Sequence, residues 1–168
     1  MDTQNYYKQP GVAEKSFGPD GEELTLNSMS PGSFSDSLYS LLFIAALERI
    51  SSADTAVSCG IGNGRLESAL LSKLYIKKLI AIDISHPLLD NLNPHPKLQK
   101  IQGDLTRLSE LIPPTKAWFI CNEVISDLAV ENNKNTGALK FLHELKKVML
   151  PGSLVVVTEY GYPREPMP

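Results

Sequence analysis

The sequence predicts an α/β fold with a Rossmann-like, doubly wound and mostly parallel sheet, on three observations. Five short segments that suit buried strands, the third of them weak, alternate along the chain with segments of helical periodicity. The second of them, 78–84, is apolar until its aspartate, as in a strand covered on both faces. Polar residues follow where these segments end, which is the edge at which open α/β sheets bind ligands.

The N-terminal region is expected to be irregular. Residues 1–35 are rich in Gly, Ser, Pro and acidic residues and show little periodicity, which predicts an arm before one domain at 36–162. Ser35 and Asp36 can cap a helix that runs from about residue 37 to residue 50. The expected inward residues of this helix are Leu38, Leu41, Leu42, Ala45 and Ile50.

The other elements follow in order. Strands are expected at 54–59, 78–84, 98–102, 117–122 and 154–158. Helices are expected at 65–74, 86–92, 105–111 and 137–149, the last with Leu139, Leu142, Leu145 and Val148 inward. The Pro-rich end at 163–168 is expected to be a tail.

Composition and charge argue against several classes of function. The 168 residues carry a formal net charge of −3, which gives no electrostatic reason to bind nucleic acid or an anionic membrane. No apolar run approaches the roughly 20 residues of a membrane helix, and the start of the sequence lacks the features of a signal peptide. Cys59 and Cys121 are expected to be buried free thiols in a reducing cytoplasm. The spacing of histidines and cysteines predicts no metal site.

The stretch 56–71, AVSCGIGNGRLESALL, is predicted to form a strand, a glycine turn and a helix. Gly60, Gly62 and Gly64 let the backbone turn sharply and leave it bare. The helix that follows directs its free N–H groups towards the turn, which suits a polar or anionic ligand. The alternative is a glycine-rich turn with no ligand.

The spacing around these glycines favours S-adenosylmethionine over a nicotinamide cofactor. The nicotinamide fingerprint GxGxxG would need a glycine at Arg65, whereas GxGxG is similar to the loop of class I S-adenosylmethionine-dependent methyltransferases. Asp83 ends the second strand 19 residues after Gly64 (83 − 64), where a carboxylate can accept both hydroxyls of a ribose. Alternatively, Asp83 caps the turn at Ser85 or keeps the strand end soluble.

The resemblance to class I methyltransferases also implies a role for Asp104. In those enzymes an acid or amide after the third strand faces the amino group of adenine. Aspartate is equally a preferred N-cap, so capping of a helix at 105–111 explains the residue as well. Both readings stay open.

Two further segments resemble the MidA-like methyltransferases, which are the mitochondrial complex I assembly methyltransferases and their bacterial relatives. Residues 121–130, CNEVISDLAV, look like the NE-x-x-x-D-x-x-V segment of that family, and 159–162, EYGY, is similar to its DYGY. The arm at 1–35 is similar to its N-terminal segment. The resemblance implies a class I methyltransferase fold at 36–162, S-adenosylmethionine as cofactor and a protein arginine side chain as acceptor.

Four polar residues after the fourth and fifth strands carry the predicted chemistry. The cofactor is already activated, so the protein mainly aligns donor and acceptor. Glu123 is expected to orient an arginine guanidinium, with Asp127 and Glu159 as further catalytic carboxylates. Asn122 is expected to bind the cofactor or the acceptor through its amide. Alternatively, Glu123 and Asp127 cap the next helix and Glu159 is solvated.

Two features depart from the family pattern. The family usually carries an acid at the position of Ser58, where it binds ribose or positions the methionine amino group. A serine hydroxyl forms hydrogen bonds there without a charge. The sequence also stops soon after the fifth strand, where the fold normally continues with further strands. The fifth strand is therefore expected to be an exposed apolar edge that a partner chain or a second copy covers.

These observations predict a cytoplasmic S-adenosylmethionine-dependent methyltransferase that acts on protein arginine or on a small-molecule amine or hydroxyl. One alternative is a methyltransferase-like subunit without transfer activity that works with a partner chain. Another is a fold whose pocket is reused in a biosynthetic pathway. The expected cofactor-binding residues are Ser58, Gly60, Gly62, Gly64, Asp83, Asp104 and Asn122.

Overall fold

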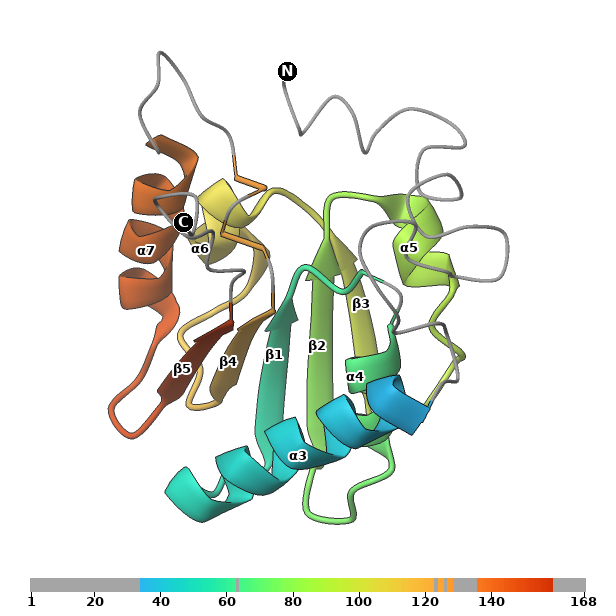
Figure 1. Ribbon diagram of the computed structural model, residues 1–168. Helices are drawn as coiled ribbons and strands as arrows, with labels where there is room; N and C mark the ends of the chain where they lie inside the picture. Colours follow the sequence, from blue (N-terminus) through green and yellow to red (C-terminus); the bar gives the residue numbers. More distant parts are fainter. Residues whose placement is uncertain (1–33, 63, 123, 126, 129–135, 159–168) are drawn as a thin grey trace, which may run out of the picture.

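The chain folds around a parallel sheet of five strands in the order β3-β2-β1-β4-β5 (Figure 1). The structure is a computed structural model, and it describes residues 34–62, 64–122, 124–125, 127–128 and 136–158. The strands are β1 (Thr55–Cys59), β2 (Lys78–Asp83), β3 (Leu98–Gln102), β4 (Trp118–Asn122) and β5 (Leu154–Thr158). The predicted α/β class with a parallel Rossmann-like sheet is confirmed.

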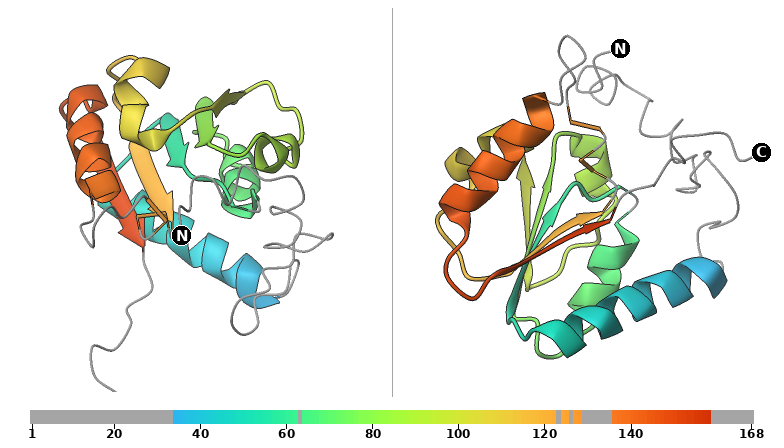
Figure 2. Two further views of the ribbon diagram at one scale, coloured as in Figure 1. Left: turned by 90° about the horizontal axis from the view of Figure 1, so that it is seen from above. Right: turned by 60° about the vertical axis from the view of Figure 1, so that its left-hand side comes forward.

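Helices cover both faces of the sheet, so the molecule has three layers (Figure 2). One face carries α3 (Phe34–Ile50), α4 (Arg65–Leu71) and α5 (His86–Asp90). The other carries the 3₁₀ helix η1 (Leu105–Arg107), α6 (Leu108–Leu111) and α7 (Thr136–Val148). Alternate residues of the central strands therefore enter two separate apolar layers, as the period of two in a strand requires.

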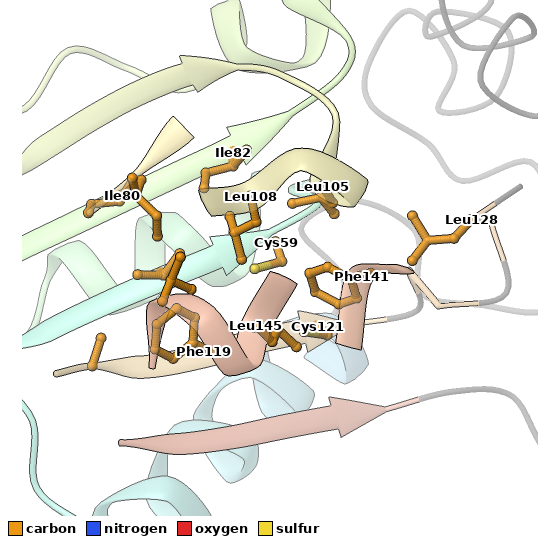
Figure 3. Close-up of a cluster of buried hydrophobic side chains, with 14 residues drawn as sticks. Cys59, Ile80, Ile82, Leu105, Leu108, Phe119, Cys121, Leu128, Phe141 and Leu145 are labelled. Carbon is orange, nitrogen blue, oxygen red and sulfur yellow. The ribbon is translucent and has the colours of Figure 1, made fainter. Parts of the chain in front are cut away.

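The layer under α6 and α7 includes Cys59, Phe119 and Cys121 from the strands and Phe141 from α7 (Figure 3). Both cysteines are buried free thiols, as expected from the sequence. Contact with Cys121, and then burial, raise the pKa of the Cys59 thiol well above its ordinary value, so Cys59 stays protonated. The opposite layer holds Trp118 and residues of α3 and α4, and Trp118 is 1% exposed.

The inward face of α7 differs from the expectation in part. Leu145 and Val148 are buried as predicted, but Leu139 and Leu142 are exposed. Steps of three residues drift by about 60° round a helix, so a run of them cannot stay on one face. The residues that do pack inward alternate steps of three and four, and they are Ala138, Phe141, Leu145 and Val148.

Helix α3 also differs from the expectation. It begins at Phe34, so Ser35 and Asp36 lie inside its first turn instead of capping it. The buried residues are Ile44 and Leu47, and the expected Leu42, Ala45 and Ile50 are exposed. Apolar residues occur all round this helix, so their periodicity does not select the buried side. The side chains of the expected Leu38 and Leu41 lie outside the described residues.

Several element ends also differ from the predicted ones. Helix α4 ends at Leu71, because the Lys73 N–H bonds Leu70 O and tightens the last turn. The helix expected at 105–111 divides at Arg107, whose φ of −129° is outside the α-helical region. The arm at 1–33 and the tail at 163–168 lie outside the described residues.

Strand β5 forms the edge of the sheet next to β4. In the described residues β5 pairs with β4 alone, and Val157 is 45% exposed. No helix in the described ranges combines the length and apolarity that a membrane crossing requires.

Candidate ligand site at the carboxyl edge of the sheet

The strand order reverses direction between β1 and β4, and this switch point defines the candidate site. The chain passes from β1 to β2 on one side, and β4 pairs with β1 on the other. In open α/β sheets the crevice outside the carboxyl ends of the strands at such a point binds ligands. Ser58, Asp83 and Asn122 all lie at that edge, on β1, β2 and β4.

The glycine loop, which we define as residues 60–62 and 64, lies between the end of β1 and the start of α4. Gly60, Gly62 and Gly64 have φ values of 77°, 50° and 77°, a region that other residues rarely adopt. A Cβ on Gly60 would lie 2.3 Å from Val124 Cγ2, and one on Gly64 would lie 2.5 Å from Leu92 Cδ2. The fold therefore requires Gly60 and Gly64 with or without a ligand, so the evidence for a ligand must come from other residues.

Asp83 holds the glycine loop against the end of β2. Its Oδ2 accepts a hydrogen bond from the Ile61 N–H at 2.9 Å, and its Oδ1 accepts one from the Ser85 N–H at 2.8 Å. Asp83 thus caps the turn at Ser85, which is one of the alternatives that the sequence left open, and a contact with ribose stays a prediction. The side chain is 7% exposed, and burial raises its pKa, while hydrogen bonds from the backbone of Ile61, Ser85 and Ile84 lower it. A carboxylate has about four acceptor positions, so these three N–H groups leave room for a further donor.

Glu67 is a site residue that the sequence analysis missed. It lies in the first turn of α4, is 2% exposed and accepts a hydrogen bond from the Ser58 hydroxyl through Oε1. Burial raises the pKa of Glu67 to about 7, and the nearby Asp83 contributes to the rise. The available signal was an acid three residues before Leu70, on the buried face of a short helix.

Ser58 is 1% exposed, and its hydroxyl donates a hydrogen bond to the carboxyl group of Glu67. The expected contact of Ser58 with a cofactor stays a prediction. A carboxyl group, which β1 lacks at this position, is thus present on the adjacent helix α4, beside the same strand end. A hydroxyl bonded to a carboxylate is a charge-assisted pair, which is roughly twice as strong as a neutral one.

Asp104 caps the 3₁₀ helix η1, which is the alternative that the sequence left open. Its Oδ1 accepts hydrogen bonds from the N–H and the hydroxyl of Thr106, both at 2.8 Å. The neighbouring Gly103 N–H bonds the Asp83 carbonyl oxygen at 2.9 Å, so Asp104 follows directly after the strand beside Asp83. A contact of Asp104 with adenine remains a prediction.

The predicted catalytic group is described only in part. Asn122 Oδ1 accepts a hydrogen bond from the Thr158 hydroxyl, which links the ends of β4 and β5. Asp127 is exposed in a turn that its own N–H closes onto Val124 O at 3.2 Å. Glu123 and Glu159 lie outside the described residues.

A separate hollow of about 850 Å³ lies at the opposite, amino end of the strands. Its lining includes Asp54, Tyr75, Lys77, Lys116 and Trp118. It shares no residue with the glycine loop or with Asp83, and we place no part of the candidate site there. The described ranges bring together no group of His, Cys, Asp and Glu that could hold a metal ion.

No protein-family model and no curated protein matches the sequence, but solved structures share the fold. The N-methyltransferase NodS from Bradyrhizobium japonicum WM9, solved with S-adenosyl-L-homocysteine, matches with a TM-score of 0.64 and 15% identity, over 94% of this chain and 72% of NodS. The [4+2]-cyclase SpnF matches with a TM-score of 0.58 and 14% identity, over 71% of this chain and 44% of SpnF.

A third similar structure is the Haloferax volcanii partner of the methyltransferase activator Trm112. It matches with a TM-score of 0.57 and 16% identity, over 93% of this chain and 59% of that one. The present chain spans about half of the first structures that it matches, 48% and 44% of their lengths. These likenesses establish a fold that methyltransferases use, and the reaction must be argued from the residues of the site.

Proposed function

We propose that this protein binds S-adenosylmethionine at the glycine loop and catalyses transfer of the methyl group. The observation that supports this most is Asp83, a buried carboxylate bonded to the glycine loop at the carboxyl end of β2. A ribose requires such an acceptor beside bare backbone, and the switch point between β1 and β4 is where open sheets take ligands. The fold shared with NodS, which was solved with S-adenosyl-L-homocysteine, supports the same class of ligand.

In this proposal different site residues bind different parts of S-adenosylmethionine. Asp83 and the backbone of the glycine loop hold the ribose, and Asp104 lies towards the adenine. Ser58 and Asn122, on the two strands that flank the switch point, hold the methionine portion. The bound S-adenosylmethionine supplies an activated methyl group, so the task of these residues is to bind and to align.

The acceptor that we propose is a protein arginine side chain, with a small-molecule amine or hydroxyl next. This rests on the resemblance of residues 121–130 and 159–162 to the MidA-like segments. Glu123, Asp127 and Glu159 are the carboxylates that we propose to orient the acceptor. An arginine needs this orientation because its guanidinium is a weak nucleophile that carboxylates can hold in a fixed plane.

A second candidate function is binding without methyl transfer. One reading is a subunit that works with a partner chain, and another is a pocket reused for a different reaction. The similar fold of the [4+2]-cyclase SpnF favours this candidate, because that enzyme is named for a cyclisation. The first candidate requires turnover of a methyl donor, whereas the second does not.

Calorimetric titration of the full chain with S-adenosylmethionine and S-adenosyl-L-homocysteine tests the proposal. We expect saturable binding of both, and Asp83→Ala should weaken it by about 1–3 kcal/mol, since it removes hydrogen bonds to a charged acceptor. Asp54→Ala is the matched control, because Asp54 is an exposed aspartate at the other end of the sheet, 3.6 Å from Lys77. It should leave both affinities unchanged.

Two results would contradict the proposal. Absence of binding at millimolar ligand would exclude S-adenosylmethionine as the cofactor. An unchanged affinity in folded Asp83→Ala would remove Asp83 from the site. Release of S-adenosyl-L-homocysteine during incubation with arginine-containing peptides then separates a methyltransferase from a protein that only binds the cofactor.

A further inference from the structure

Glu67 carries the one buried carboxylate oxygen of the described residues that has no hydrogen-bond partner. The side chain is 2% exposed, and Oε1 is bonded by the Ser58 hydroxyl. Oε2 is buried and unpartnered in the part of the chain that the structure describes. Leaving a buried acceptor unsatisfied costs about 1–3 kcal/mol, and more when it is charged. Such a group in a folded protein calls for a donor from elsewhere.

Glu144 on α7 shows how this fold satisfies a buried carboxylate when the role is structural. Its side chain is 8% exposed. Oε2 accepts the Ser109 N–H at 2.8 Å and the Ser109 hydroxyl, and Oε1 pairs with the Lys147 ammonium. Glu144 thus has a donor at each oxygen and a cation beside it. The groups that face the Glu67 carboxyl are the Ser58 hydroxyl from β1, the backbone N–H of Glu67 itself and the Asp83 carboxylate from β2, so no cation of the described residues pairs with it.

Glu67 lies beside the candidate site at the carboxyl edge of the sheet. Ser58 comes two residues before Gly60, and Glu67 comes three residues after Gly64, so the pair closes the base of the glycine loop. Asp83 is bonded to the same loop through the Ile61 N–H. Two carboxylates therefore lie next to the loop. Both oxygens of Asp83 accept hydrogen bonds, whereas Oε2 of Glu67 has no partner in the described residues.

We propose that Glu67 receives the α-ammonium group of the methionine portion of S-adenosylmethionine through Oε2, with Ser58 as the residue that positions its carboxylate. This rests on the proposed function. The ligand has one ammonium group, and a buried carboxylate is stabilised best by a cation that also donates hydrogen bonds. Asp83 then serves the ribose and Glu67 the amino acid end, so the two carboxylates recognise different parts of one ligand.

The test compares two adenosyl ligands that differ in the amino acid portion. S-adenosyl-L-homocysteine carries the ammonium group, and 5′-methylthioadenosine lacks it. In calorimetry with the full chain, Glu67→Gln should raise the dissociation constant of S-adenosyl-L-homocysteine by about tenfold or more. The same variant should change the affinity for 5′-methylthioadenosine by less than about twofold, since that ligand has no partner for Glu67.

Glu144→Gln is the matched control, because it alters a buried carboxylate on the other face of the sheet. We expect it to lower the melting temperature without changing the ratio of the two affinities. If Glu67→Gln lowered the affinities for both ligands equally, the inference would be overturned and Glu67 would have a structural role. A wild-type chain that binds neither ligand would instead overturn the proposed function and this inference with it.

A measurement on the unchanged chain covers the case in which Glu67→Gln does not fold. Because Glu67 holds a proton below about pH 7, the ammonium must displace that proton. Titration of S-adenosyl-L-homocysteine at pH 6, in two buffers of different ionisation enthalpy, should show the release of nearly one proton. Asp83 faces Glu67 and can also titrate, so 5′-methylthioadenosine is titrated in parallel. Equal proton release with both ligands would contradict the proposal.

Discussion

At the scale of single residues, two buried carboxylates of the site respond differently to their surroundings. Burial raises the pKa of both Asp83 and Glu67. Backbone N–H groups of Ile61, Ser85 and Ile84 offset part of this rise at Asp83, whereas Glu67 has the Ser58 hydroxyl and its own N–H. Ionisation of Glu67, with a pKa of about 7, therefore opposes folding near neutral pH.

Stability should consequently fall as the pH rises through the titration of Glu67. Its pKa is about 7 in the folded chain against an ordinary 4.5, so the folded state binds the proton more tightly. The protonated carboxyl contributes up to roughly 3 kcal/mol to the free energy of unfolding. This contribution is complete below about pH 4.5 and is lost as the pH rises through about 7. Urea unfolding gives the free energy of unfolding of Glu67→Gln and of the wild type. The difference between them should shift in favour of the variant by about that amount from pH 5 to pH 8.

Glu144 gives the opposite pH dependence and so serves as the control. Lys147 and Ser109 lower the pKa of Glu144 to about 2. Its stabilising effect is complete above its ordinary pKa of 4.5 and is lost as the pH falls towards 2. The deficit of Glu144→Gln should therefore shrink in acid. A constant difference between Glu67→Gln and the wild type from pH 5 to pH 8 would exclude the assigned titration.

The sequence could indicate Asp83 but not Glu67, for a physical reason. Asp83 follows an apolar strand at a fixed distance from the glycines, and both features are local in the chain. Glu67 becomes a site residue only because α4 folds back onto β1 and places it against Ser58. An acid in the first turn of a helix is more often a solvated residue that favours the helix dipole, so its burial has to be observed.

At the scale of elements, the glycine loop depends on close packing from two other segments. Val124 follows β4 and lies against Gly60, while Leu92 follows α5 and lies against Gly64. The loop is thus held between the segment that follows β4 and the segment that follows α5. Substitution of Gly60 combines two penalties, a left-handed backbone and a collision with Val124.

We expect Gly60→Ala to destabilise the chain by about 2–5 kcal/mol, from strain at positive φ and from overpacking. Gly152→Ala is the matched control, because its φ is 85° and its Cβ would meet only the end of the flexible Lys116 side chain. It should cost about 1–2 kcal/mol, the backbone part alone. Urea unfolding measures both values.

A double variant separates the two contributions at Gly60. Gly60→Ala combined with Val124→Ala removes the collision with Cγ2 and should recover part of the loss. Equal destabilisation by Gly60→Ala and Gly152→Ala would show that Val124 does not press on the loop.

The helices show where sequence periodicity was sufficient and where it was not. Strands β3 and β5 match their predicted bounds. Pro96 and Gly103 flank β3, and Pro151 and Gly152 precede the apolar run of β5. In α7 the residues Ala138 and Phe141 form the buried face with Leu145 and Val148, one position away from the expected leucines. Apolar residues occur on both sides of this buried face, so the packing of the helix against the sheet decides which of them are buried.

At the scale of the whole molecule, the order of the strands determines which surfaces remain open. The order β3-β2-β1-β4-β5 places the candidate site in the middle of the carboxyl edge. It also leaves β3 and β5 at the two sides. The alternation of strands and helices predicted this class of sheet, but it did not show that Glu67 would bond Ser58 beside the candidate site.

The side of β5 that faces away from β4 is the surface that we propose a partner chain or a second copy covers. Val157 is 45% exposed on a strand that in the described residues pairs only with β4. An apolar strand with unpaired backbone groups favours further pairing, and two copies of one edge can pair about a two-fold axis.

Light scattering of the purified chain should therefore give the mass of a dimer. Val157→Lys should shift it to the monomer, because a charge on the edge opposes pairing. Leu74→Lys is the matched control, since Leu74 is 94% exposed but lies after α4, away from that edge. A wild-type monomer at about 50 µM, above the micromolar dissociation constants of weak dimers, would exclude the second copy as the cover of β5.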